Sequence, residues 1–186
     1  MSLLTDHFPT AVLIDDEEVP INSDFRTGLR IMAAYEDDDL ADREKLAIML
    51  ELLYDEVPAN TGEAIRLAVK FLDCGSEQSN EEAAAPDEGR LLSFTQDAQY
   101  IYSAFRQAHG VDLNKDDLHW WEFCFLLRDL APDCFLYRII NLRRAKRTGK
   151  MTKEEREYYY RIQDIVDLPQ RMTAEDKEFE RLLRGG

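Results

Sequence analysis

Residues 94–142, FTQDAQYIYSAFRQAHGVDLNKDDLHWWEFCFLLRDLAPDCFLYRIINL, are the most apolar and aromatic part of the chain. Both tryptophans of the protein, Trp120 and Trp121, lie side by side in this stretch. Aromatic side chains bury more apolar area than other residues, so these residues are expected to form the core. The side chains predicted to lie in that core are Tyr100, Ile101, Phe105, Trp120, Trp121, Phe123, Leu127 and Ile139.

The same stretch divides into three predicted helices. The first covers about 96–108, with Ser93 or Thr95 as its expected N-cap. The second, about 120–130, is apolar nearly all round, which is typical of a buried central helix. A proline two residues later ends it, and Asp133 is expected to cap the third helix, about 134–146.

The N-terminal sequence predicts a β-hairpin. Apolar residues 12–14 and 19–21 flank the polar residues 15–18, although the turn lacks the Asn-Gly or Asp-Gly pair that favours tight hairpins. Pro20 restricts the second run to an edge strand. Because a two-stranded ribbon is marginally stable in water, we expect it to pack on the helices or to pair with a partner.

Three short amphipathic helices are predicted next, the first capped by Ser23 or Asp24. Gly28 inside this first helix weakens it by about 1 kcal/mol relative to alanine. The other two are expected over about 42–54 and from a cap at Thr61 to about residue 75. The links between the three are short, which predicts antiparallel neighbours.

Residues 75–90, GSEQSNEEAAAPDEGR, contain no aromatic and no β-branched residue and are predicted to form a flexible acidic loop. This loop is not expected to be a domain boundary, because three short helices cannot bury their apolar faces alone. The predicted organisation is a helical domain, residues 1–148, followed by a helical C-terminal appendage, residues 149–186. The fold class is therefore mainly α, a compact multi-helix bundle with a small N-terminal β-hairpin.

The chain is strongly acidic, with a formal net charge of −15 at pH 7 and a pI of about 4.6. The charge is uneven, because residues 143–186 carry 12 Lys and Arg against 9 Asp and Glu, whereas residues 1–142 carry 11 against 29. An acidic surface argues against binding to nucleic acid or to an anionic membrane. No segment approaches the roughly 20 apolar residues of a membrane span. Neither nucleic acid nor a membrane is therefore an expected partner.

The three cysteines, Cys74, Cys124 and Cys134, have no CxxC spacing and predict neither a disulfide framework nor a zinc site. Cys124 and Cys134 have apolar neighbours and are expected to be buried free thiols, which fits a reducing cytoplasm. The N-terminal residues lack the basic region and the apolar run of a signal peptide. A cytoplasmic location is therefore expected.

No catalytic or cofactor-binding motif is recognisable: the zinc-protease, P-loop, dinucleotide and nucleophile-elbow patterns do not occur. His109 and His119 would be an unspecific pair of metal ligands, and His119 is interpreted instead as a helix-start residue with a satisfied ring nitrogen. The acidic runs 15–18 and 36–39 lack the spacing of a calcium loop and are interpreted as solvated charge. We therefore expect no enzyme activity, no cofactor and no metal.

Residues 143–153 hold six basic side chains and no acidic one. One interpretation is an exposed helix end, where cations are favoured by the helix dipole. A second is a contact for an acidic partner, such as the acidic surface of another copy of the chain. A third is a nucleic-acid site, against which the lack of interleaved aromatic residues argues.

Three consecutive tyrosines follow the basic segment, in a helix predicted over about 153–166 and started by a capping box of Thr152 and Glu155. Consecutive helical residues point about 100° apart, so at least one ring is exposed or buried against a partner. A last amphipathic helix is expected from about residue 173, with Phe179, Leu182 and Leu183 on its apolar face. The candidate partner-binding residues are Arg143, Arg144, Lys146, Arg147, Tyr158, Tyr159 and Tyr160.

A family resemblance is carried by three segments, SFTQDAQYIYSAFRQAHGVDL, LHWWEFCFLLRDL and FLYRIINLRRAK, within residues 93–146. The histidine followed by paired tryptophans, residues 119–121, is its most specific element. These segments resemble the bacteriophage gene-product-fifteen proteins of phage and prophage tail gene clusters. The later sequence MTKEEREYYY also resembles that family, so the resemblance covers about residues 90–160, whereas the N-terminal hairpin and its helices match in style only.

The resemblance implies a helical, non-enzymatic protein of the tail module, acting in the cytoplasm of the host bacterium. Proteins at that gene position are thought to be tail assembly chaperones, which coat the long, aggregation-prone tape-measure protein until tail-tube subunits replace them. The tape-measure protein is therefore the expected partner, and a homo-oligomer is a further expectation. The alternatives are a structural virion component of the tail or connector region, a helical adaptor without a chaperone role, and an enzyme or nucleic-acid binder in an unfamiliar helical fold.

Overall fold

A short hairpin and eight helices make up the part of the chain that the structure, a computed structural model, describes: residues 4–76 and 90–168. The expected mainly helical fold with a small N-terminal β-hairpin is confirmed. Nearly all of the expected acidic loop, and the expected last helix with Phe179, Leu182 and Leu183, lie outside these residues. The elements are β1 (Ala11–Ile14), β2 (Glu17–Pro20), α1 (Phe25–Glu36), α2 (Asp42–Leu53), α3 (Thr61–Leu72), α4 (Ala98–Ala108), α5 (Trp120–Arg128), α6 (Phe135–Thr148), α7 (Lys153–Arg161) and α8 (Gln163–Val166).

The hairpin turns on two aspartates. β1 and β2 are antiparallel, with Val12 opposite Val19. Asp15 and Asp16 have φ angles of 50° and 65°, the left-handed geometry that a two-residue type I′ turn requires. Aspartate tolerates this geometry better than most residues, so the hairpin forms without a glycine. Ile14 is buried and β1 packs against α3, so the ribbon is stabilised by the helices, as the sequence predicts.

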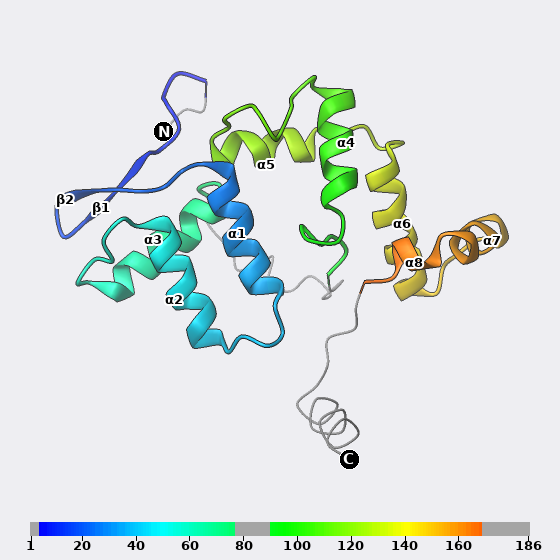
Figure 1. Ribbon diagram of the computed structural model, residues 1–186, viewed down its shortest axis with the longest axis horizontal. Helices are drawn as coiled ribbons and strands as arrows, with labels where there is room; N and C mark the ends of the chain where they lie inside the picture. The colour runs from blue at the N-terminus through cyan, green and yellow to red at the C-terminus, as the bar shows by residue number, and fades with distance from the viewer. Residues whose placement is uncertain (1–3, 77–89, 169–186) are drawn as a thin grey trace, which may run out of the picture.

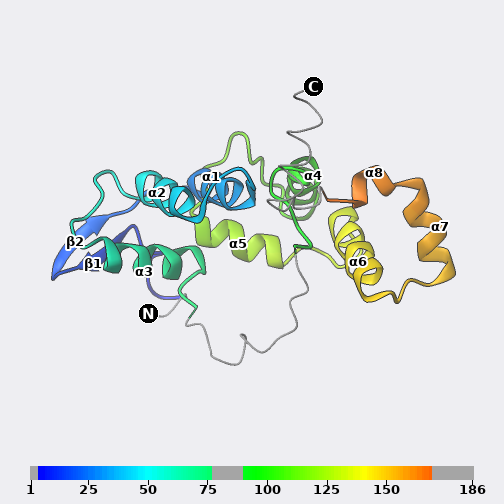
Figure 2. The ribbon, with the colours of Figure 1, turned by 90° about the horizontal axis from the view of Figure 1, so that it is seen from below.

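The elements are arranged in a row along the long axis of the molecule. α1 packs against α2 and α5, α2 packs against α3, and α4 packs against both α5 and α6. Figure 1 shows the hairpin at one end of this row and α7 at the other, with α5 and α4 between them. Figure 2 shows the same order from below. The hairpin and the C-terminal helices are therefore opposite ends of the protein.

The paired tryptophans join α5 to α1 and α3. Trp120 packs on α1 at Gly28, where a Cβ atom would overlap the indole ring. The indole N–H groups donate to two carbonyls at the end of α3: Trp120 Nε1 to Leu72 O (2.9 Å) and Trp121 Nε1 to Phe71 O (2.7 Å). The last carbonyls of a helix lack partners within it, so the two indoles cap α3 while they fill the core. This close approach of Trp120 to α1 explains why a glycine stands at position 28, although glycine lowers helix stability.

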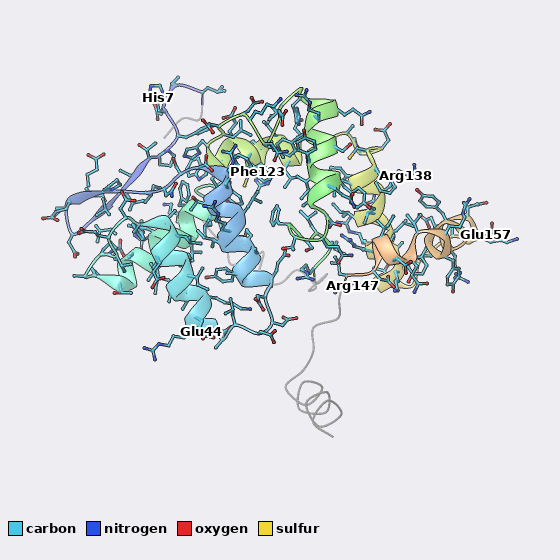
Figure 3. The ribbon with its side chains drawn as sticks, viewed as in Figure 1. His7, Glu44, Phe123, Arg138, Arg147 and Glu157 are labelled. Atoms are coloured by element: carbon cyan, nitrogen blue, oxygen red, sulfur yellow. The ribbon has the colours of Figure 1, made fainter. Side chains whose placement is uncertain are left out.

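Aromatic rings stack around Phe123, which lies near the middle of the molecule (Figure 3). The rings of Phe25, Phe105 and Trp120 stack on it with centroid distances of 5.3, 5.0 and 5.7 Å. Two residues predicted to lie in the core are only half-buried and pack against the buried core residues: Tyr100 and Leu127. The others are buried: Ile101, Phe105, Trp120, Trp121, Phe123 and Ile139.

Two predicted N-caps are displaced. Asn60, and not Thr61, is the N-cap of α3, where its side chain accepts from the N–H of Glu63. Asp97, and neither Ser93 nor Thr95, is the N-cap of α4.

Two further details of the predicted helix ends are wrong. Asp133 does not cap α6, because Cys134 occupies the N-cap position and makes no side-chain cap hydrogen bond. The single helix expected over 153–166 is broken at Ile162, whose φ of −126° and ψ of 23° leave the α region, so α7 and α8 are separate. The expected capping box of Thr152 and Glu155 at the start of α7 is confirmed. At this break the chain turns so that the carbonyls of Ile165 and Val166 reach Arg143 of α6. These tertiary contacts override the local helix preference.

The C-terminal helices fold back on α6 around a second, small apolar cluster. Leu142, Tyr159 and Val166 are buried together there, separately from the main core. α8 packs against α6 and α7 packs against α8. The described part of the expected appendage therefore has its own contacts with the end of the helical domain, while the division at residue 148 stays a prediction.

Candidate partner-binding surface

The basic segment predicted as a partner contact is the last turn of α6 and the loop after it. α6 ends at Gly149, which takes a left-handed φ of 67° and lets the chain turn toward α7. Arg144 and Arg147 are exposed, and Figure 3 labels Arg147. Arg143, in contrast, is only 5% exposed. The prediction that Arg143 belongs to an exposed partner-binding surface is therefore wrong.

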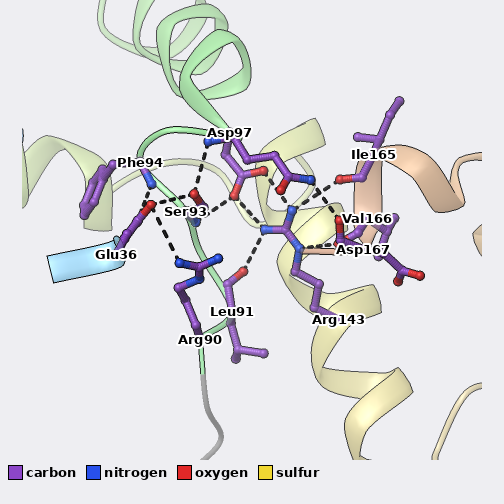
Figure 4. A network of polar contacts seen from close by, with 11 residues as sticks. Glu36, Arg90, Leu91, Ser93, Phe94, Asp97, Arg143, Ile165, Val166 and Asp167 are labelled. Carbon is purple, nitrogen blue, oxygen red and sulfur yellow. Dashed lines mark hydrogen bonds and ion pairs between the residues drawn. The ribbon is translucent and has the colours of Figure 1, made fainter. Parts of the chain in front are cut away.

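The guanidinium of Arg143 uses all of its five N–H groups inside the protein (Figure 4). Two of them donate to the fully buried carboxylate of Asp97, with N–O distances of 2.6 and 2.9 Å. The others donate to the carbonyls of Leu91, Ile165 and Val166. A planar fork with five donors suits this arrangement, which a lysine cannot reproduce. Arg143 thus ties α6 to the start of α4 and to the end of α8.

A second polar contact in the same region involves Glu36, at the end of α1. Its carboxylate accepts hydrogen bonds from Ser93 Oγ (2.7 Å) and from the backbone N–H of Phe94 (2.8 Å) (Figure 4). Arg90 lies 4.0 Å from it. The interpretation of residues 36–39 as solvated charge is therefore wrong for Glu36, which positions the segment before α4.

Lys146, Tyr159 and Asp167 form a clasp between α6, α7 and the end of α8. The ammonium of Lys146 donates to Tyr159 Oη (2.6 Å) and to Asp167 Oδ1 (2.7 Å), and Tyr159 Oη donates to Asp167 Oδ2 (2.8 Å). Burial raises the pKa of Asp167, but the hydrogen bonds from Lys146, Tyr159 and Gln163 outweigh it, so this pKa lies below its ordinary value. The clasp engages two of the three donors of the Lys146 ammonium, which is exposed, and the hydroxyl of the buried Tyr159.

The three tyrosines differ in exposure, as their spacing requires. Tyr159 is buried, Tyr158 is half-buried and Tyr160 is 67% exposed. The guanidinium groups of Arg138 and Arg161 lie 4.8 and 5.5 Å from the Tyr158 ring centroid, which is cation–π distance. Of the seven predicted partner-binding side chains, four are therefore exposed: Arg144, Lys146, Arg147 and Tyr160.

An apolar groove, which sequence reasoning missed, lies between the hairpin and α3. Its volume is about 240 Å³ and its wall is almost entirely apolar. Leu13, on its rim, is 62% exposed although it is a large aliphatic side chain. The groove is lined by Pro9, Val12, Leu13, Leu67, Lys70, Phe71, Gly75 and Trp121.

A sequence signal for this groove exists in the first strand. Val12, Leu13 and Ile14 are apolar in succession, whereas a strand with one solvated face alternates apolar and polar residues. Successive strand side chains point to opposite faces, so the buried Ile14 leaves Leu13 on the outer face. β1 therefore has apolar residues on both of its faces, and Leu13 stays exposed while Ile14 is buried.

Both histidines considered as metal ligands are bound to the backbone instead. His109 Nε2 lies 2.9 Å from Leu126 O, and His119 Nε2 lies 3.0 Å from Pro9 O. His119 is the N-cap of α5, where its Nδ1 accepts from the N–H of Trp121 (3.0 Å), so the expected helix-start role is confirmed. Burial holds the pKa of His119 below its ordinary value. Within residues 4–76 and 90–168, no group of three or more potential metal ligands comes together.

The three cysteines are free thiols, but they are half-buried rather than buried. Cys74 follows α3 with a left-handed φ of 56° and shares a hydrogen bond with Cys124 of α5. That bond, with a smaller contribution from Arg128, lowers the pKa of Cys74. The same bond and then burial raise the pKa of Cys124. The expectation of buried thiols at Cys124 and Cys134 is therefore corrected, because each lies at the edge of the core.

A family of proteins described as bacteriophage Gp15 protein matches residues 4–168 of the chain. The chain belongs to this Gp15 family. The match extends well beyond the segments that carry the resemblance in the sequence, and includes the hairpin and α1–α3. No curated protein and no solved structure was found to match.

The Gp15 match therefore contains the whole described fold, with the apolar groove at one end and the Arg143 contacts near the other. No helix among the described residues of this Gp15 chain is long and apolar enough to cross a membrane. Family membership associates the protein with bacteriophages.

Proposed function

We propose that this Gp15-family protein is a tail assembly chaperone, which binds the tape-measure protein in the host cytoplasm until tail-tube subunits replace it. The protein then works by binding another polypeptide and not by catalysis. The family association with phages supports the setting. The observation that carries the binding role is the apolar groove between β1 and α3 on an otherwise acidic protein.

The groove suits side chains of a helical partner better than a small molecule. Its volume of about 240 Å³ is below the range of about 300–1,000 Å³ that is usual for small-molecule sites. An amphipathic helix can place one or two apolar side chains into such a groove, as in other helix-in-groove complexes. Leu13 on the exposed rim would then lie against the body of that helix.

The net charge of the protein supports a chaperone role, because it helps to keep a complex with an apolar partner in solution. A chaperone for an aggregation-prone partner has to cover apolar surface and keep the complex dispersed. A net charge of −15 provides the electrostatic repulsion that keeps complexes soluble. The groove and the charge together supply both properties.

The test is co-expression of this chain with an apolar helical fragment of the tape-measure protein encoded in the same tail gene cluster. The wild-type chain is expected to keep the fragment soluble and to co-purify with it. Leu13→Asp places a charge on the rim of the groove and should shift the fragment to the insoluble fraction. Leu4→Asp is the matched control, since Leu4 is 97% exposed and outside the groove.

Two results would contradict the proposal. Insolubility of the fragment with the wild-type chain would exclude the chaperone role itself. Equal solubility with Leu13→Asp and with wild type would exclude the groove as its site, and Tyr160→Asp at the opposite end would then test the exposed tyrosine predicted from the sequence.

A further inference from the structure

A second groove lies between β2 and the loop that joins α2 to α3. It is the larger of the two, with a volume of about 540 Å³. Five carboxylates line it, and none of its described lining residues is a lysine or arginine: Asp15, Glu17, Glu18, Asp55 and Glu56. The hydrogen bond from Asn60 Nδ2 to Asp15 Oδ1 (2.8 Å) joins its two walls.

Apolar side chains form the rest of this acidic groove. Ile14 is buried at its base, while Val57 on the loop is 45% exposed. Pro20 and Pro58 also line it, and neither residue can rearrange freely because proline fixes its own φ angle. A docking site of this kind suits a segment with cationic side chains and some apolar surface, since buried apolar contact and opposite charge then act together.

The opposite end of the same protein presents such a segment. Four basic residues are exposed on the end of α6, the loop after it and the first residue of α7, with no acidic residue between them in the sequence: Arg144, Arg147, Lys150 and Lys153. The half-buried Met151 in the same loop supplies apolar surface. Because the two regions lie at opposite ends of the long axis, the segment cannot reach the acidic groove of its own chain (Figures 1 and 2).

We propose that the acidic groove between β2 and the α2–α3 loop binds the basic segment 144–153 of a second copy of this chain, in a head-to-tail contact. Each copy then offers one groove and one basic segment. Such a contact is heterologous, so it repeats along a row of copies or closes into a ring. This inference goes beyond the chaperone role and does not depend on it.

The experiment uses the purified full chain and two variants in analytical ultracentrifugation at low ionic strength. Glu17→Gln/Glu56→Gln removes charge from the groove but keeps the basic segment. Arg147→Gln/Lys150→Gln removes charge from the segment but keeps the groove. These side chains are exposed, so both variants should fold, which circular dichroism and the melting temperature verify.

The wild type is expected to form oligomers that grow with concentration and dissociate in high salt, where charges are screened. Each variant alone should associate about tenfold more weakly, because it loses two exposed charge pairs. A mixture of the two should form a 1:1 heterodimer and stop there, since only one intact groove and one intact segment can meet. Matched controls, Glu51→Gln/Asp133→Asn and Arg30→Gln/Arg43→Gln, remove exposed charges elsewhere and should associate like the wild type.

Three outcomes would overturn the proposal. The first is a wild type that stays monomeric at low salt, which would leave the groove to a basic segment of another protein. The second is a groove or segment variant that associates as strongly as its matched control. The third is a mixture of the two variants that stays monomeric while the wild type associates. Sedimentation of the chain alone tests this contact, whereas solubility of the tape-measure fragment tests the chaperone proposal, so a failure of one is distinguishable from a failure of the other.

Discussion

Replacement of Arg143 by methionine tests the polar contacts that tie the C-terminal helices to the rest of the fold. The substitution keeps a long apolar stem but removes five N–H donors, so the carbonyls of Leu91, Ile165 and Val166 lose a hydrogen bond each. It also leaves the carboxylate of Asp97 buried without its cation. Removal of one partner from a buried ion pair destabilises a protein by about 3–5 kcal/mol.

The free energy of unfolding can be measured by urea denaturation followed by the fluorescence of the two buried tryptophans. We expect Arg143→Met to lower it by about 3–5 kcal/mol. Arg144→Met is the matched control, because this exposed neighbour donates a hydrogen bond to Asn141 (3.3 Å) on the surface, and its change should be within about 0.5 kcal/mol. In a double-mutant cycle with Asp97→Asn, the coupling energy should exceed about 1 kcal/mol.

Local opening of the C-terminal helices can be measured separately from global unfolding, because their apolar cluster is separate from the core around the tryptophans. Hydrogen exchange of the backbone N–H groups of Val166 and Asp167, which bond to Ile162 and Gln163, should accelerate in Arg143→Met. A loss of less than about 1 kcal/mol in global stability together with unchanged protection of these two groups would refute the reasoning, because a buried guanidinium with five partners cannot be removed without either effect.

Three further predictions concern the core and its titration. Gly28→Ala should lower the free energy of unfolding by about 1–3 kcal/mol despite the better helix propensity of alanine, because its Cβ would overlap Trp120; urea denaturation of the variant measures this, and a gain in stability would contradict the packing described for the indole. Burial, with a smaller contribution from Glu63, raises the pKa of Tyr54 to about 12. The contribution of neutral Tyr54 to the free energy of unfolding should be fully present below pH ~10 and decrease by about 1.4 kcal/mol per pH unit from there toward pH 12. Tyr54→Phe should flatten this alkaline decrease, and an equal decrease in both proteins would contradict the prediction. Burial lowers the pKa of His119, whose neutral ring caps α5. The contribution of this neutral ring to the free energy of unfolding should be fully present above pH ~6.5 and decrease at lower pH, because the unfolded chain then binds a proton that the folded protein does not. A free energy of unfolding of the wild type that does not change between pH 7 and pH 5 would argue against this role.

Local sequence signals predicted the elements because each rests on a local physical cause. The capping box at Thr152 and Glu155 and the hairpin at 11–20 both appear where the sequence places them. The dense aromatic stretch also forms the core around Phe123. Burial of large apolar side chains is the dominant favourable contribution to folding, so a dense apolar stretch is a reliable signal.

Charged residues were harder to assign, because their state depends on partners that are distant in the sequence. Arg143 stands in a run of basic residues and was predicted to be exposed, but its partner Asp97 lies 46 residues earlier. Glu36 likewise begins an acidic run, residues 36–39, but its carboxylate accepts a hydrogen bond from Ser93, which lies 57 residues later. Nothing in either run distinguishes the buried member from its exposed neighbours.

The candidate surfaces were missed for a related reason. The groove at Leu13 and the acidic groove both form where the hairpin meets α3 or the loop before it, so neither exists within one segment of sequence. Periodicity predicts which face of an element is apolar, but not whether another element covers that face. The uncovered face of β1 became visible only when the position of α3 was known.

The most direct test of the central claim, that the β1–α3 groove holds the tape-measure protein, is photocrosslinking in cells that assemble the phage. A photoreactive amino acid in place of Leu13 stands on the rim of the groove, and the same amino acid in place of Leu4 provides the control. We expect mass spectrometry to identify the tape-measure protein in the adduct formed at position 13 and not in that formed at position 4. An adduct at position 13 with tail-tube or connector subunits, and none with the tape-measure protein, would contradict the account.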